Sequence, residues 1–131
     1  MKIVPLAIIA AIVLSGCTTT ASVPPTPVTT PVSLSAAQQK AVQEGVRGSL
    51  KDPNSAMFRG QLRAARSEEG VTFVCGVVNA KNSYGGYTGD KPFIGGMESD
   101  GKFIVAGMGG TDTESLSVIS VCQKYGIVAN G

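Results

Sequence analysis

The chain has 131 residues, with eleven lysines and arginines against nine acidic residues, and a formal net charge of +2. So weak a charge excludes the strong electrostatic attraction on which nucleic-acid binding depends. The sequence contains no histidine, so a nucleophile would need a lysine or an acidic pair to activate it. No such pair shares an evident site, and we expect neither an enzyme nor a cofactor or metal.

The amino-terminal residues have the order of a bacterial signal peptide. Lys2 precedes an apolar run over residues 3–14, shorter than the roughly 20 residues that a permanent membrane-spanning helix needs. The run ends in Leu14-Ser15-Gly16-Cys17, which resembles the lipobox of bacterial lipoproteins. The resemblance implies cleavage before Cys17 and attachment of lipid, including a fatty acid such as palmitate, to this cysteine. An ordinary secretory signal with a chance cysteine is the alternative.

Lipid on Cys17 makes the membrane a predicted partner and the cell envelope the predicted location. Two or three acyl chains hold a protein firmly, because each buried methylene contributes about 0.8 kcal/mol. Lipoproteins of the inner membrane resemble one another in carrying aspartate directly after the lipidated cysteine. This chain has Thr18 at that position. We therefore expect the periplasmic face of the outer membrane.

The composition divides the chain into three parts. Residues 1–16 are the predicted signal peptide, residues 17–34 the lipidated cysteine and a linker, and residues 35–131 one small domain. The linker holds four prolines, six threonines and no charge. Proline prevents it from forming a helix or a central strand. Fully extended, it would hold the domain up to roughly 50 Å from the lipid.

Cys75 and Cys122 are the two cysteines that remain once Cys17 carries lipid. In an exported chain such a pair is expected to form a disulfide. Closing a loop of this length would stabilise the fold by roughly 4 kcal/mol. Two buried free thiols are the alternative.

Hydrophobic periodicity predicts the element order α-β-β-β-β-α. Ser35 and Gln38 form a capping box that begins the first helix, and Thr111 or Asp112 caps a second helix that ends near Tyr125. Between the helices, alternating or strongly apolar segments predict strands over residues 57–66, 71–80, 91–98 and 102–108. We expect an α+β fold: a small four-stranded antiparallel sheet with the N-terminal and C-terminal helices packed on one face.

The segment from Asn79 to Gly89 combines amide, ammonium and phenol groups with glycines. In a recognition surface, the tyrosines would provide rigid contact area, and the amides and lysine would orient the partner. The candidate binding residues of this segment are Asn79, Lys81, Asn82, Tyr84 and Tyr87. The alternative is a wide hairpin whose asparagines bond their own backbone and whose glycines supply positive φ.

Arg59 and Arg63 are a second candidate binding site. The alternation of the predicted strand places them on one face. They could contact an anionic lipid or glycan, or form an ordinary solvated sheet face.

Together with residues 50–58, the stretch 79–89 resembles a class of small exported proteins of bacteria and their phages that has no established activity. The whole pattern predicts a membrane-anchored envelope lipoprotein with a non-enzymatic binding or structural role. Its partner would be an envelope protein or glycan, and not nucleic acid. Two alternatives stay open: a component of a secretion or conjugation assembly, and a phage-derived lipoprotein that excludes infection or inhibits a wall enzyme of the host.

Overall fold

The computed structural model describes residues 16, 17 and 20–128. The predicted signal peptide therefore lies outside the described residues, apart from Gly16. Within the described part of the chain, no helix has the length and apolar character needed to cross a membrane.

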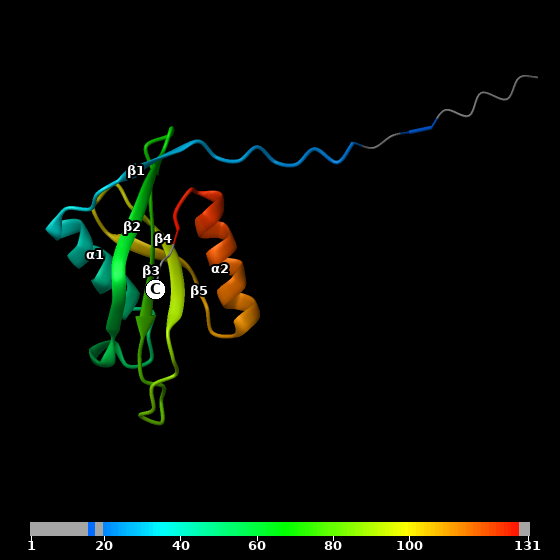
Figure 1. The fold of residues 1–131 in the computed structure, drawn as a ribbon. Coiled ribbons are helices and arrows are strands. Elements are labelled where there is room, and N and C mark those ends of the chain that lie inside the picture. The colour runs from blue at the N-terminus through cyan, green and yellow to red at the C-terminus, as the bar shows by residue number, and fades with distance from the viewer. Residues whose placement is uncertain (1–15, 18–19, 129–131) are drawn as a thin grey trace, which may run out of the picture.

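A five-stranded antiparallel sheet forms the centre of the domain, with its strands side by side in chain order (Figure 1). The strands are β1 (Thr29–Val32), β2 (Met57–Ser67), β3 (Thr72–Asn79), β4 (Lys91–Met97) and β5 (Phe103–Met108). The last four agree with the predicted strands to within one residue at each end. The α+β class and the antiparallel arrangement are thus confirmed.

The first strand comes from the predicted linker, so the sheet has five strands and not four. Thr29–Val32 pairs antiparallel with the segment from Ala64 to Ser67 at the end of β2. Pro31 lacks an amide donor, which excludes a central strand but is tolerated at a sheet edge. Val32 packs against the hydrophobic core. The folded domain therefore begins at Thr29, earlier than the predicted Ser35.

Each of the two helices begins with a capping box. In α1 (Ala36–Arg47), the Gln38 amide donates to Ser35 Oγ at 3.2 Å, and the Ser35 amide donates to Gln38 Oε1 at 2.9 Å. Thr111 and Glu114 form the same pair at the start of α2 (Asp112–Lys124). A short 3₁₀ helix, η1 (Pro53–Ser55), joins α1 to β2.

The helices cover opposite faces of the sheet (Figure 1), which corrects the prediction that they share one face. Successive residues of a strand point to opposite faces. Val74 and Val78 of β3 therefore pack in the cluster under α1, whereas Cys75 packs in the cluster under α2. The prediction was wrong because the apolar pattern of β3 indicates two covered faces without showing which helix covers which.

Cys75 and Cys122, the pair for which the sequence predicts a disulfide, are joined by one in the structure. Their Cα atoms lie 6.3 Å apart, and both residues are buried. Since Cys75 belongs to β3 and Cys122 to α2, the bond fixes the second helix to the centre of the sheet.

Candidate functional site

The segment between β3 and β4 forms a hairpin that projects from one end of the sheet (Figure 1). It follows Asn79, which pairs with Met57 at the start of β2. The linker enters at the other end, because Thr29 pairs with Ser67 at the end of β2. The hairpin and the linker thus lie at opposite ends of the domain.

Asn82 folds the tip of the hairpin. Its Oδ1 atom accepts hydrogen bonds from the backbone amides of Tyr84 at 2.9 Å and Gly86 at 3.1 Å. Gly85 between them has a φ of 80°, which a glycine adopts without strain. Lys81 and Tyr87 form an isolated antiparallel bridge below this turn. The Asn82 side-chain oxygen is therefore engaged within the hairpin, as in the structural alternative.

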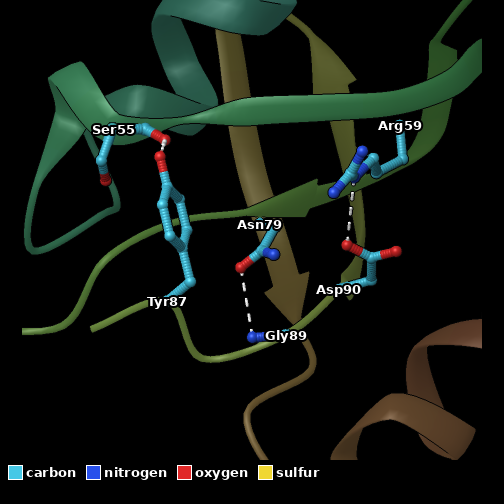
Figure 2. A network of polar contacts seen from close by, with 6 residues as sticks. All are labelled: Ser55, Arg59, Asn79, Tyr87, Gly89 and Asp90. Carbon is cyan, nitrogen blue, oxygen red and sulfur yellow. Dashed lines mark hydrogen bonds and ion pairs between the residues drawn. The ribbon is translucent and has the colours of Figure 1, made fainter.

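Asn79 closes the base of the hairpin. Its side chain is buried, and its Oδ1 accepts from the backbone amide of Gly89 at 3.1 Å (Figure 2). The bond ties the last residue of β3 to the chain that returns toward β4. The predicted binding residue Asn79 thus has a structural position.

The 3₁₀ helix η1 braces one side of the hairpin. The Tyr87 hydroxyl donates to the Ser55 carbonyl oxygen at 3.2 Å (Figure 2), and the Ser55 hydroxyl accepts from the Lys81 amide at 2.8 Å. The Lys81 ammonium lies 5.5 Å from the centroid of the Tyr87 ring, within range of a cation–π contact. Tyr87 is 47% exposed, but its ring and hydroxyl hold the hairpin in place.

Tyr84 differs from the other candidate residues in this segment. Its side chain is 97% exposed, and its hydroxyl makes no hydrogen bond to any other described residue. The backbone beneath it is fixed by Asn82. A tyrosine held in this way offers a large contact area at a low cost in conformational entropy. Tyr84 is therefore the residue of the hairpin best placed to contact a partner.

Arg59 and Arg63 share one face, as the sequence predicts, although a bulge separates them. They pair with Val77 and Cys75, so residues 60–62 stand opposite Gly76 alone. Gly60 accommodates the bulge with a φ of 62°. Both arginines are exposed and lie on the face of Cys75, which α2 covers farther along the sheet.

The two arginines have different surroundings. Arg59 Nε lies 3.4 Å from Asp90 Oδ1, and the two side chains are 50% and 54% exposed. So exposed a pair contributes at most about 1 kcal/mol, but it joins β2 to the returning end of the hairpin (Figure 2). Arg63 has no carboxylate within 4 Å in the described part of the chain. The structure thus brings Arg59 to the hairpin and leaves Arg63 apart from it.

Ser55 and Asp90 belong to the site, although the sequence analysis did not select them. Both act through contacts between residues about thirty positions apart: Ser55 with Tyr87, and Asp90 with Arg59. The turn signal of Pro53 and Asn54 beside Ser55 indicates only local structure. No local pattern indicates that this turn packs against the later hairpin.

The acidic residues and cysteines of the described part of the chain suggest no metal centre. Across residues 16, 17 and 20–128, no three His, Cys, Asp or Glu side chains are grouped so that they could hold a metal ion. Cys17 is exposed and outside the disulfide. Residues 20–28 behind it form neither helix nor strand.

The chain matches no protein-family model, and comparison with curated proteins and with solved structures finds no similar protein. The lipobox resemblance and the resemblance to small exported proteins of bacteria and phages therefore stay predictions.

The two tyrosines should respond differently to truncation. Tyr84→Ala removes an exposed side chain and should change the free energy of unfolding by no more than about 0.5 kcal/mol. Tyr87→Ala removes a hydrogen bond and a cation–π contact and should lower it by roughly 1–2 kcal/mol. Urea denaturation measures both values. Equal losses of unfolding free energy in the two variants would show that the contact of Tyr87 with Ser55 does not stabilise the hairpin.

Proposed function

We propose that this chain is an envelope lipoprotein that binds a partner without enzymatic activity, through the tip of the hairpin. Lipid on Cys17 would anchor it, and the Thr/Pro-rich segment would carry the domain. The proposed location is the periplasmic face of the outer membrane, and the proposed partner is an envelope protein or glycan.

The anchor is supported by the lipobox pattern and by the position of Cys17 ahead of the domain. Cys17 is exposed, and the folded domain begins at Thr29. Because β1 takes up the end of the predicted linker, about twelve residues separate the lipid from the sheet. In an extended form they would span up to roughly 35 Å. This is shorter than the reach that the sequence alone predicts, but long enough to keep the domain clear of the lipid headgroups.

The observation that carries the proposal is the position of Tyr84. The side chain is 97% exposed on a hairpin held by hydrogen bonds that Asn79 and Asn82 accept and that the Tyr87 hydroxyl donates. This hairpin lies at the end of the sheet opposite the linker. A loop that is already ordered loses little further entropy when it binds. The arrangement favours a partner on the side of the domain away from its own membrane.

Site-specific photo-crosslinking in cells tests the binding surface. A benzophenone amino acid would replace Tyr84 and, as a matched control, Leu116 of α2, which is 68% exposed. We expect a discrete adduct from position 84 and none from position 116. The identity of the adduct would also separate an assembly component from an inhibitor of a wall enzyme.

Affinity provides the second measurement of this experiment. Loss of a contact aromatic often costs more than about 2 kcal/mol of binding, or roughly 30-fold in Kd. Tyr84→Ala should therefore abolish capture in envelope pull-downs while leaving the melting temperature unchanged. Adducts of the same pattern from both positions, or capture that survives Tyr84→Ala, would contradict the proposed surface.

The lipid anchor is tested with a Cys17→Ser variant. Cells fed an alkyne fatty acid should label the wild-type chain, and the variant should be unlabelled and either uncleaved or released from the membrane. The reason is that the cysteine thiol is the proposed attachment site. Cys75 and Cys122 are engaged in the disulfide, so they provide no second thiol for the label. Label on the variant would overturn the anchor.

A further inference from the structure

A small pocket lies beside the base of the hairpin, on the face of the sheet that α1 covers. Its volume is about 140 Å³. Its apolar lining includes Leu50, Val78 and Met108, which also pack against the core under α1. The lining also includes Ala80, three neutral polar residues and three lysines: Lys51, Lys81 and Lys91.

The three lysines come from three separate segments. Lys51 follows α1, Lys81 begins the hairpin, and Lys91 begins β4. Lysine side chains cover apolar surface with their stems and keep the ammonium group in water. We therefore expect the ammonium groups on the solvent side of the pocket, where that of Lys81 also lies 5.5 Å from the centroid of the Tyr87 ring. The pairing of Val78 with Lys91 puts the latter on the same face as the pocket floor.

The positive charge at this pocket is not neutralised by an ion pair. In the part of the chain that the structure describes, no carboxylate lies within 4 Å of the Lys51, Lys81 or Lys91 ammonium. Lys40 and Lys102, in contrast, each pair with a carboxylate. Three lysines that line one pocket and have no ion-pair partner produce a local positive potential that attracts an anion.

The charge of Lys91 acts on the Glu114 carboxylate, but this carboxylate accepts its hydrogen bonds at the start of α2. Hydrogen bonds from the Thr111 and Gly110 amides lower the pKa of Glu114, and the Lys91 charge contributes least to this lowering. These two amides lie 2.8 and 3.0 Å from Glu114 Oε2. The carboxylate thus caps α2 and leaves the Lys91 ammonium available.

Asn82 adds a neutral donor to the pocket. Its Oδ1 is taken by the Tyr84 and Gly86 amides. Its side-chain nitrogen, in contrast, finds no acceptor among the described residues. Asn82 also lines the pocket. The site therefore combines three ammonium groups with an amide donor.

We propose that this pocket binds a phosphomonoester group. Three ammonium groups match the double negative charge of a phosphomonoester better than the single charge of a carboxylate, and lysine binds phosphate as a point charge. At about 30 Å³ per water molecule, the pocket holds the volume of four to five waters, enough for a phosphate group but not for a nucleotide. The apolar lining would contact the first carbons of the ester. This site goes beyond the proposed function, because it needs no contact with Tyr84.

Full-length protein in maltoside micelles, titrated with methyl phosphate and followed by ¹H–¹⁵N NMR, tests the proposal. We expect saturable shifts at Lys81, Thr88 and Lys91, weakened by added NaCl. The double change Lys81→Gln with Lys91→Gln should weaken binding by about tenfold, since each exposed charge contact contributes up to about 1 kcal/mol. The matched control is Lys40→Gln with Lys102→Gln, which removes the same charge and should leave the affinity unchanged. Because Lys81→Gln also removes the contact with the Tyr87 ring, the first double variant should melt at a slightly lower temperature than the wild type. Both double variants should remain folded at the temperature of the titration.

The absence of saturable shifts would overturn the proposal, as would equal weakening in the control variant or equally tight binding of acetate. A second arm separates the sources of the phosphate. Protein anchored in phosphatidylcholine vesicles would be mixed with vesicles that contain phosphatidic acid. Tethering that depends on Lys81 and Lys91 supports a lipid headgroup. Methyl phosphate binding without tethering supports a phosphate on a soluble molecule or glycan.

Discussion

The burial of β3 on both faces is the constraint on which the rest of the domain depends. Val74 and Val78 point into the cluster under α1, and Cys75 points into the cluster under α2. The disulfide to Cys122 holds the second helix against the same strand. Because a strand covered on both sides cannot shift its register without exposing its apolar side chains, its end at Asn79 has a fixed position. The hairpin starts from that position.

Three polar contacts fix the conformation of the hairpin from its base at the sheet to its tip. Asn79 ties the two ends of the hairpin together, the Ser55 carbonyl holds Tyr87, and Asn82 shapes the turn. Most of the polar groups that make the segment unusual in sequence are used within the protein. The two proposals assign Tyr84 at the tip and the lysines at the base to other molecules, although Lys81 also contacts the Tyr87 ring. Under the proposed function, the recognition surface and the structural hairpin, which are alternatives in the sequence, would be two parts of one loop.

Local patterns were sufficient to predict most of the fold. The capping boxes and the period of two in the strands depend on residues near one another, so the sequence places α1, α2 and β2 to β5 well. The first strand was missed because Pro31 indicates only where pairing is unfavourable, and the pairing of Thr29–Val32 with the end of β2 is a distant contact. The prediction that both helices cover one face was wrong for a similar reason, since the face that a helix covers depends on the path of the chain around the sheet.

The candidate site was predicted less completely than the fold. Composition identified the hairpin, but only the contacts distinguish the buried Asn79 from the exposed Tyr84. The role of Ser55 depends on a contact with a residue 32 positions away. The three lysines of the pocket are spread over about forty residues, so no spacing in the sequence indicates that they line one pocket.

The account rests on the claim that the hairpin is an ordered display and not a flexible loop. Backbone ¹⁵N relaxation of the full-length protein in micelles measures this directly. If Asn79, Asn82 and the Ser55 brace hold the hairpin, the order parameters of residues 81–87 should be about 0.85, as in the strands. Values below about 0.6 across the same residues, with ordered strands on either side, would contradict it.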